Sequence, residues 1–160
     1  MTKDKKISVL FVCLGNICRS PMAEAVFTAM VKKRGLRDRF QIDSAGTAAY
    51  HLGEFPDKRT IAACFSNGVP VRHQARQVCE EDFYTFDYIL CMDEDNLKDL
   101  NDEKPAGSTP RIELFGSYSA EKGDRIIKDP YYGDRDNFEA NFNQVTRCSE
   151  GLLKELGLFD

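Results

Sequence analysis

The start of the chain combines two apolar patterns, and this combination limits the fold more than any other feature. Residues 7–12 are almost entirely apolar, as in a strand that is buried on both faces. From residue 20 to Gly35, apolar side chains recur at spacings of three and four, as in an amphipathic helix. Ser20 and Pro21 suit the cap and the first position of that helix. The chain therefore opens with a strand, a short loop and a helix.

The same alternation continues to the end of the chain. Three further strands are predicted over "FQIDSAG", "FDYILCMD" and "PRIELFG", which are residues 40–46, 86–93 and 110–116. One helix is predicted between Asp57 and Gly68, with Ile61 and Phe65 on one face, and a long one ends the chain. Alternating strands and helices form parallel sheets. We expect an α/β fold: a four-stranded parallel sheet with helices on both faces, doubly wound, in a flavodoxin-like three-layer sandwich.

Length, charge and cysteine content limit the classes of protein to which this chain can belong. The 160 residues suffice for one core, so we expect a single domain over 1–160 and a monomer. The net charge of −4 argues against nucleic acid or an anionic membrane as a partner. No apolar run approaches the roughly 18 residues of a membrane span. The six cysteines lack a paired metal spacing, so we expect reduced thiols in the cytoplasm, with no metal and no cofactor.

The segment "VCLGNICRSP", residues 12–21, joins the first strand to the first helix and carries the most distinctive chemistry. In parallel α/β sheets, ligands bind beyond the carboxyl ends of the strands, where this loop lies. Its backbone N–H groups can surround one anion, and Arg19 can add a bidentate contact to a phosphate. Without an anion, the same groups and the Ser20 hydroxyl would stabilise a Cys13 thiolate. The loop predicts a nucleophile and a phosphate site in one place.

Two other interpretations of this loop stay open at the level of the residues. A glycine-rich nucleotide loop ends in lysine followed by serine or threonine, whereas Arg19 stands at that point here. Alternatively, Cys13 is an inert buried thiol and Arg19 is a surface ion-pair partner. The strand before the loop and the helix after it favour the phosphate site.

Four segments, in chain order, resemble stretches of the low-molecular-weight protein tyrosine phosphatases. They are "VCLGNICRSP", "DSAGT" (43–47), "YILCMD" (88–93) and "DPYYGD" (129–134), and the chain is similar to this family from end to end. The resemblance implies an acid phosphatase that hydrolyses protein phosphotyrosine and small aryl phosphates through a phosphocysteine intermediate, releasing inorganic phosphate. It implies Cys13 as the nucleophile, Arg19 as the phosphate clamp, Asp129 as the general acid and base, and Ser20 as a stabiliser of the thiolate.

The resemblance also implies a set of supporting and substrate-contacting residues. Asn16 is expected to hold the strained shape of the loop, and Ser44 and His73 resemble its partners in the hydrogen-bond network of the family. His73 in "VRHQARQ" can equally be solvated. Because Asp129 directly precedes Pro130, we expect it on a rigid, extended segment. The tyrosines that follow can line a slot for a flat ring, or simply flank an Asp-Pro turn. The residues that we expect to contact substrate are Leu14, Gly15, Asn16, Ile17, Cys18, Tyr50, His51, Tyr131 and Tyr132. For Leu14 and Ile17 the alternative is packing beneath the loop, and for Tyr50 and His51 it is ordinary loop exposure.

Cys18 suggests redox regulation. Two thiols in one short loop can form a reversible disulfide, which would protect Cys13 from overoxidation. The alternative is a buried cysteine with no redox role. The remaining cysteines, Cys64, Cys79, Cys91 and Cys148, are predicted to be packing residues on helices or strands.

Two other functions compete with the phosphatase. A thiol-dependent arsenate reductase of the same fold needs further cysteines on a mobile segment, and Cys79 and Cys91 are the candidates. Cys91 lies in a predicted buried strand, which argues against that motion. A non-catalytic phosphate- or phosphopeptide-binding module needs neither a nucleophile nor an acid, so Cys13 and Asp129 argue against it.

Overall fold

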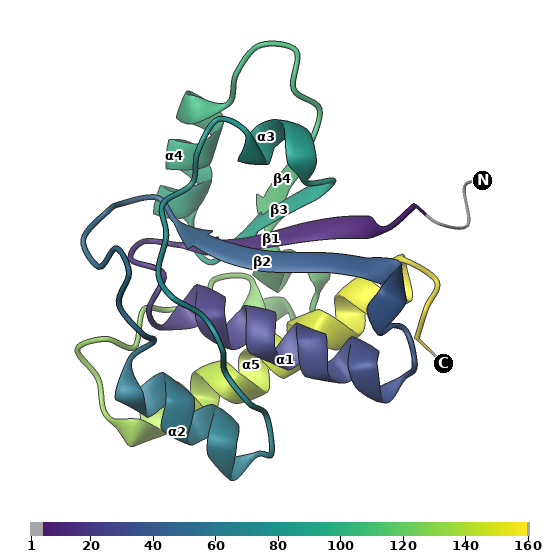
Figure 1. The fold of residues 1–160 in the computed structure, drawn as a ribbon. Helices are drawn as coiled ribbons and strands as arrows, with labels where there is room; N and C mark the ends of the chain where they lie inside the picture. The colour runs from purple at the N-terminus through teal and green to yellow at the C-terminus, as the bar shows by residue number, and fades with distance from the viewer. Residues whose placement is uncertain (1–4, 160) are drawn as a thin grey trace.

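The computed structural model describes residues 5–159 and contains a parallel sheet of four strands. The strands are β1 (Ile7–Cys13), β2 (Phe40–Gly46), β3 (Tyr88–Cys91) and β4 (Arg111–Leu114), in the order β2-β1-β3-β4 (Figure 1). β1 pairs with β2 from Ile7 opposite Phe40 to Cys13 opposite Gly46. The expected four-stranded parallel sheet is confirmed. Its carboxyl edge gathers the ends of β1, β2 and β3.

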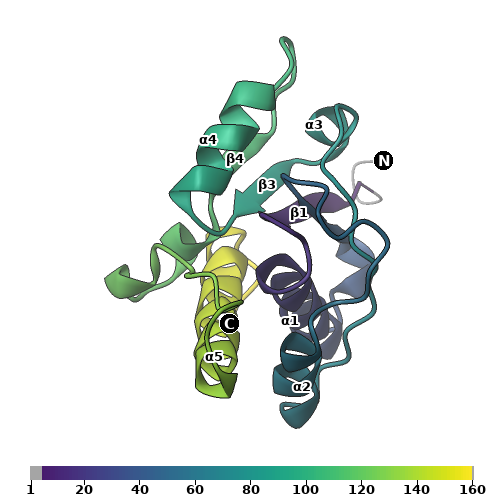
Figure 2. The same ribbon diagram turned by 90° about the vertical axis from the view of Figure 1, so that its left-hand side faces the viewer.

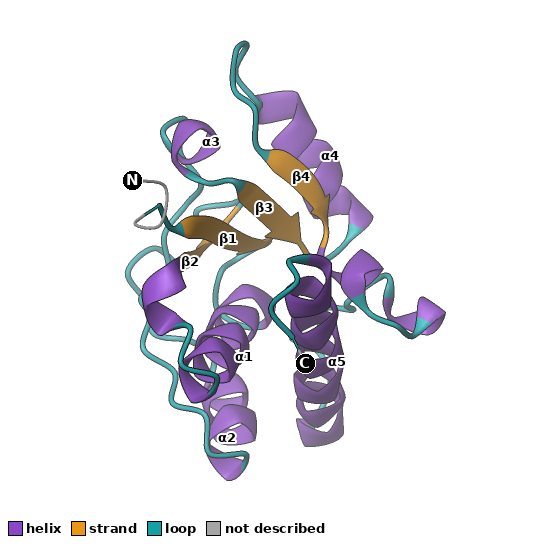
Figure 3. Ribbon diagram, turned by 90° about the vertical axis from the view of Figure 1, so that its right-hand side faces the viewer, coloured by secondary structure: helices purple, strands orange, loops and turns teal. Residues whose placement is uncertain are grey.

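Helices cover both faces of the sheet, as expected for a three-layer α/β fold (Figures 1, 2 and 3). One face carries α1 (Arg19–Lys33) and α5 (Arg135–Glu155), with α2 (Lys58–Ser66) packed against both. The other face carries α3 (Asp82–Thr85) and α4 (Glu94–Glu103). Three short 3₁₀ helices complete the described structure: η2 (Arg37–Arg39), η3 (Phe115–Tyr118) and η4 (Lys122–Asp124). Among the described residues, no helix has the length and apolarity needed to cross a bilayer.

Strand β1 divides the core into two clusters. Successive side chains of a strand point to opposite faces, so Val9 and Phe11 join the cluster under α1 and α5. Leu10 and Val12 join the cluster on the α3 and α4 side. All four are 0% exposed, which explains why β1 is a continuous apolar run rather than an alternating one.

The start of α1 differs from the expectation in a way that matters for the site. The helix begins at Arg19, and its N-cap, Cys18, makes no side-chain capping bond. Ser20 was expected to be the cap but lies inside the first turn. Its hydroxyl is 3.0 Å from Sγ of Cys13, so it faces the loop rather than the free amides of the helix.

Helix α2 is capped as expected, but it buries a different face. The carboxylate of Asp57 accepts a hydrogen bond from the N–H of Arg59 (2.8 Å), which is an N-cap contact. Ile61 and Phe65 are 37% and 81% exposed, because the face that packs on α1 and α5 carries the small residues Thr60, Ala63 and Cys64.

Two further differences concern the middle of the chain. Cys79 was expected on a helix or strand as a packing residue, but it is exposed in the irregular segment before α3. The sequence did not predict α3, which has only four residues and therefore little periodicity to detect. Residues 1–4 and 160 of the expected single domain lie outside the described residues.

Candidate active site

The loop between β1 and α1 is curled tightly and held against the end of β2. Asn16 has φ = 59°, in the left-handed region that asparagine tolerates better than most residues. The N–H of Thr47 donates to the carbonyl of Cys13 (2.9 Å), and that of Ala48 to the carbonyl of Leu14 (3.0 Å). A Cβ on Gly46 would lie 2.7 Å from the carbonyl oxygen of Leu14, so this close approach requires glycine.

Cys13 lies at the end of β1 with its sulfur surrounded by hydrogen-bond donors. It is 3% exposed, and Sγ accepts a hydrogen bond from the N–H of Asn16 (3.3 Å). The Ser20 hydroxyl oxygen accepts from Nδ2 of Asn16 (2.8 Å). Its hydrogen has two acceptors within reach, Sγ of Cys13 at 3.0 Å and the carbonyl oxygen of Ala45 at 3.4 Å, and the sulfur is the nearer one. The start of α1 lies beside the same sulfur. This arrangement places hydrogen-bond donors and the N-terminus of a helix around one point, which suits the binding of an anion there.

Arg19 is buried and held rigidly beside the loop. It is 2% exposed, and its NH1 donates to Oδ2 of Asp93 (2.6 Å) and to the carbonyl of Ile127 (2.9 Å). Its NH2 lies 3.6 Å from Oδ2 of Asp129. Burial opposes the charge, but the pKa of Arg19 is raised above its ordinary value, mainly by Cys13 and Asp93. The guanidinium is therefore a fixed positive charge at the cavity.

The loop, Arg19 and Asp129 share one cavity of about 240 Å³. It brings together eleven residues from three separate segments: Cys13, Leu14, Gly15, Ile17, Cys18, Arg19, Tyr50, His51, Asp129, Tyr131 and Tyr132. Leu14 is 40% exposed at the rim and Ile17 only 8% exposed. The rings of Tyr131 and Tyr132 meet edge to face, with centroids 5.0 Å apart. The cavity therefore has a polar floor and an aromatic and aliphatic rim.

Asn16 was expected both to contact substrate and to hold the loop with Ser44 and His73; its side chain does not line the cavity, but it makes the second set of contacts. It is 0% exposed, and its Nδ2 donates to Ser44 Oγ (3.0 Å) as well as to Ser20. Its Oδ1 accepts from Nε2 of His73 (2.7 Å) and from the N–H of Arg76 (3.0 Å). The left-handed backbone turns this side chain inward, where four partners hold the loop in shape. Ser44 and His73 thus lie in a network around Asn16, and His73 is not a solvated histidine.

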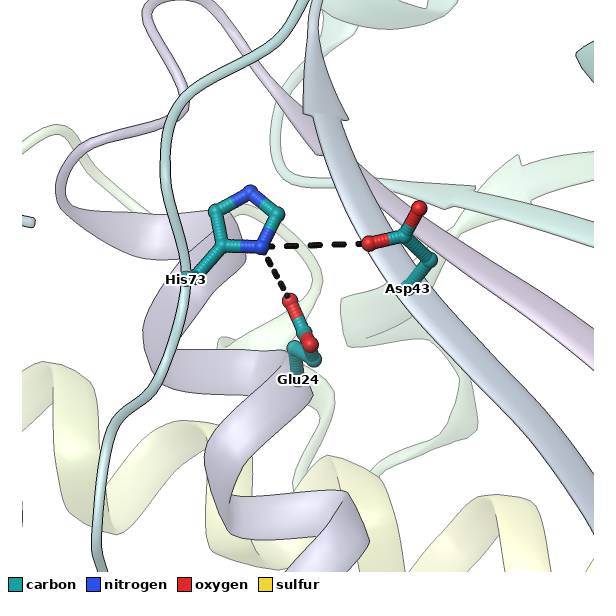
Figure 4. A group of neighbouring side chains, drawn as sticks. All are labelled: Glu24, Asp43 and His73. Carbon is teal, nitrogen blue, oxygen red and sulfur yellow. Dashed lines mark ion pairs between the residues drawn. The ribbon is translucent and has the colours of Figure 1, made fainter. Parts of the chain in front are cut away.

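The network ends in a partly buried group of titratable side chains, Glu24, Asp43 and His73, shown in Figure 4. Nδ1 of His73 lies 3.1 Å from Oε1 of Glu24 on α1 and 3.8 Å from Oδ1 of Asp43 on β2. Because Oδ1 of Asn16 can only accept, Nε2 of His73 carries a proton, and Nδ1 faces the two carboxylates. Burial raises the pKa of Glu24 to about 7 and lowers the pKa of His73, whereas Asp43 acts to raise that of His73. The geometry suits a proton shared between His73 and Glu24.

The same three side chains are a potential metal-ligand set among the described residues. Glu24, Asp43 and His73 each offer one ligand atom, and these atoms lie within 4.8 Å of one another. Both carboxylates already have partners, however. Glu24 accepts from the hydroxyl of Ser44 (2.6 Å), and Asp43 accepts from Nε of Arg76 (3.0 Å). We therefore interpret the group as part of the network that holds the loop.

The buried cysteines other than Cys13 have raised pKa values, and these are Cys18, Cys64, Cys91 and Cys148. Burial, with a contribution from Asp57, raises the pKa of Cys18 far above its ordinary value, and burial raises that of Cys91 to about 12. Cys91 is 0% exposed within β3, and Cys79 does not line the cavity. The mobile cysteine relay of an arsenate reductase is therefore not provided by these two residues.

The sequence missed Asp93 as the partner of Arg19. Its position was the available signal, because Asp93 follows β3 directly and the carboxyl end of β3 lies beside that of β1. The sequence analysis also missed the role of Glu24. The apolar periodicity predicts that Glu24 lies on the first helix, but it does not show that Ser44 is its neighbour.

The chemistry of this cavity defines a class of enzyme. A cysteine sulfur beside a backbone N–H and a hydroxyl, a fixed guanidinium and a carboxyl group lie together at the edge of a parallel sheet. These are the parts of a phosphatase that transfers a phosphoryl group to cysteine.

Comparisons with known proteins agree with that class. A family model described as low molecular weight phosphotyrosine protein phosphatase matches residues 8–158. A protein of that name from Schizosaccharomyces pombe is 49% identical over 153 residues, covering 95% of this chain and 98% of the relative. The protein tyrosine phosphatase of Entamoeba histolytica has a TM-score of 0.91 at 36% identity, covering 95% and 97%. The Drosophila arginine phosphatase has a TM-score of 0.87 at 39% identity, covering 92% and 96%. The chain belongs to the low molecular weight phosphotyrosine protein phosphatase family.

Proposed function

We propose that this enzyme hydrolyses phosphotyrosine in proteins, and small aryl phosphates, with Cys13 as the nucleophile and Asp129 as the general acid and base. One observation carries the proposal. Asp129 lies 3.6 Å from the guanidinium of Arg19 in the cavity that Cys13 also lines. A phosphate held by Arg19 would therefore have the sulfur and the carboxyl group as neighbours.

The first step transfers the phosphoryl group to sulfur. Sγ of Cys13 attacks phosphorus, and the bond to the phenolic oxygen breaks. Asp129 gives its proton to that oxygen, so a neutral phenol leaves. Arg19 and the loop amides stabilise the charge on the equatorial oxygens throughout the step.

The second step returns the enzyme to its starting state. A water oxygen attacks the phosphocysteine, and Asp129, now a carboxylate, accepts the water proton. The sulfur–phosphorus bond breaks, the thiolate of Cys13 is regenerated, and inorganic phosphate is the product. The proposal uses no metal and no cofactor.

The rim of the cavity supports an aromatic leaving group. Leu14, Ile17, Tyr131 and Tyr132 offer apolar and aromatic surface around a polar floor, which suits a phenyl ring above a phosphate. One structural neighbour is named an arginine phosphatase, so phosphoarginine is the rival substrate. Phosphoarginine would place a second guanidinium beside this rim. We expect kcat/KM for a phosphotyrosine peptide to exceed that for the matched phosphoarginine peptide.

We propose the cytoplasm as the compartment and a single chain as the active unit. A thiolate nucleophile needs a reducing environment, and the six cysteines are free. All residues that line the cavity belong to one chain, so activity should not depend on enzyme concentration. The partners are phosphotyrosine proteins rather than nucleic acid or membrane, in keeping with the net charge of −4.

Trapping the covalent intermediate tests the mechanism. Asp129→Ala slows the second step, so rapid mixing with an aryl phosphate of an acidic phenol should accumulate a phosphoryl adduct on Cys13. Mass spectrometry of the quenched protein locates the adduct, and Cys13→Ser is the control that should carry none. An adduct on another residue, or rapid turnover by Cys13→Ser, would contradict the proposal.

A further inference from the structure

The segment that carries Asp129 has little structure of its own. Residues 128–133 lie between η4 and α5 and contain no helix or strand. Within the segment, the N–H of Tyr131 donates to Oδ1 of Asp129 (3.0 Å), and that of Gly133 donates to the carbonyl of Pro130 (2.8 Å). These bonds shape the turn, but they do not set its distance from the nucleophile.

Arg59, in the first turn of α2, binds this segment from outside. Its NH2 donates to the carbonyl of Tyr131 (2.9 Å), and its NH1 donates to the carbonyl of Gly133 (3.0 Å). The guanidinium carbon lies 4.5 Å from the ring centroid of Phe138 and 5.7 Å from that of Tyr131. One side chain thus contacts two carbonyls and two rings around residues 128–133, which we call the acid segment because they include Asp129.

Helix α2 is in turn tied to the loop of Cys13. Nε and NH2 of Arg59 donate to the two carboxylate oxygens of Asp57, each at 3.0 Å. The N–H of Asp57 donates to the carbonyl of Ile17 (2.8 Å), and the hydroxyl of Thr60 donates to the carbonyl of Cys18 (3.3 Å). A continuous chain of hydrogen bonds therefore links the nucleophile's loop to the acid segment through Asp57 and Arg59.

We propose that Arg59 is a positioning residue for the general acid: it holds the Asp129 segment at a fixed distance from the Cys13 loop. This inference rests on the acid role proposed for Asp129. The planar guanidinium is required because it donates to Asp57 and to two carbonyls at once, which a lysine ammonium cannot do in the same geometry. Misplacing a catalytic group by about 1 Å can cost about 100-fold in rate.

Two substrates with different leaving groups distinguish a positioning role of Arg59 from a general structural role. In Arg59→Met, the aliphatic stem still packs on Phe138, but the hydrogen bonds are lost. We expect kcat/KM for phenyl phosphate, whose leaving group needs a proton, to fall about 30-fold. For dinitrophenyl phosphate, whose phenolate leaves without one, we expect a fall of less than about 3-fold. Arg59→Lys should lie between the wild type and Arg59→Met.

Arg111 provides a matched control. It also pairs with a carboxylate two residues away, with NH2 3.1 Å from Oε2 of Glu113, and its guanidinium lies 5.6 Å from the ring centroid of Tyr88. It stands at the first residue of β4, at the opposite edge of the sheet from the cavity. Arg111→Met should leave the rates on both substrates within about 2-fold of the wild type.

A double-mutant cycle completes the test. If Arg59 acts through Asp129, adding Arg59→Met to Asp129→Ala should lower kcat/KM for phenyl phosphate by less than about 3-fold. If Arg59→Met lowers kcat/KM by the same factor in the wild type and in Asp129→Ala, or by the same factor on the two substrates, Arg59 is not a positioning residue. Those results would leave the acid role of Asp129 standing. Wild-type turnover of phenyl phosphate by Asp129→Ala would instead overturn the acid role, and the positioning role with it. Activity on dinitrophenyl phosphate reports that each variant is folded.

Discussion

The hydroxyl of Ser20 lies 3.0 Å from the sulfur of Cys13, nearer than its other acceptor, the carbonyl oxygen of Ala45 at 3.4 Å. A hydrogen bond to a charged group contributes about 1.5–3 kcal/mol. We therefore expect Ser20→Ala to slow the alkylation of Cys13 by iodoacetate at pH 6 by about 10-fold or more. Ser117→Ala, which removes a hydroxyl bonded only to the carbonyl of Leu114, is the control. Equal alkylation rates in Ser20→Ala and the wild type would show that the hydroxyl does not stabilise the thiolate.

Asn16 combines a left-handed backbone with four side-chain hydrogen bonds, and two substitutions separate these contributions. Asn16→Gly keeps the backbone conformation accessible but removes the network, whereas Asn16→Ala also adds strain. We expect both variants to lose at least about 10-fold in kcat, and Asn16→Ala to be about 1–2 kcal/mol less stable than Asn16→Gly. Urea unfolding and steady-state kinetics measure the two effects. Equal stability of the two variants would contradict the expected strain, because it would mean that the backbone at this position leaves the left-handed conformation at no cost.

The planar guanidinium of Arg19 donates to the carboxylate of Asp93 and to the carbonyl of Ile127, and it also lines the cavity. Lysine keeps the charge but cannot make these contacts and a bidentate phosphate contact together. We expect Arg19→Lys to lower kcat about 100- to 1,000-fold and to weaken competitive inhibition by inorganic phosphate. A variant with normal phosphate inhibition and normal kcat would remove Arg19 from the proposed site.

We propose that Cys18 protects the nucleophile from irreversible oxidation. Cys18 lines the same cavity as Cys13, and burial and Asp57 raise its pKa, so its thiol keeps its proton in the reduced enzyme. Peroxide would oxidise Cys13 to a sulfenic acid. The sulfur of Cys18 would then attack the sulfur of Cys13, and the thiol proton would leave with the hydroxyl group as water, which gives a disulfide.

The prediction is that reductant restores the peroxide-treated wild type. Cys18→Ser should recover only a small fraction of its own untreated activity, because Cys13 oxidises further to acids that thiols do not reduce. Cys64→Ser, buried in α2 away from the cavity, is the control. Full recovery of Cys18→Ser would refute the protective disulfide.

The ion pair of Asp57 with Arg59 gives the stability of the protein a defined pH dependence. The hydrogen bond from Arg59 lowers the pKa of Asp57 below its ordinary value. A lowered pKa in the folded state stabilises the fold above the unfolded pKa, which is about 4, and this contribution is lost as the pH falls through the folded value. Asp57→Asn keeps a capping side chain but removes the charge.

We expect Asp57→Asn to unfold about 2 °C below the wild type at pH 6, and the difference to shrink toward zero below about pH 4. Thermal unfolding followed by circular dichroism at several pH values measures it. A constant difference across this range would show that the charge of Asp57 does not contribute.

Several features of this protein follow from sequence alone because they depend on local patterns. The continuous apolar run of β1 predicts burial on both faces, and the spacing after residue 20 predicts α1. A cysteine, a glycine and an arginine between those two elements predict an anion site, because the loop must lie at the carboxyl edge of the sheet. The motif resemblance added Asp129, whose role no local pattern reveals.

Tertiary structure decided which side chains meet. The order β2-β1-β3-β4 places the end of β3 beside the loop, and this brings Asp93 to Arg19 across 74 positions of sequence. The left-handed conformation of Asn16 places its side chain in the network with Ser44 and His73, as the motif resemblance implied, and away from the cavity, which the sequence did not show. Likewise, α2 exposes Phe65 because its small residues pack on α1 and α5, and that orientation carries Arg59 to the acid segment. Periodicity shows that a helix has two faces, but only packing decides which neighbour each face meets, because burial depends on contacts between segments distant in the chain.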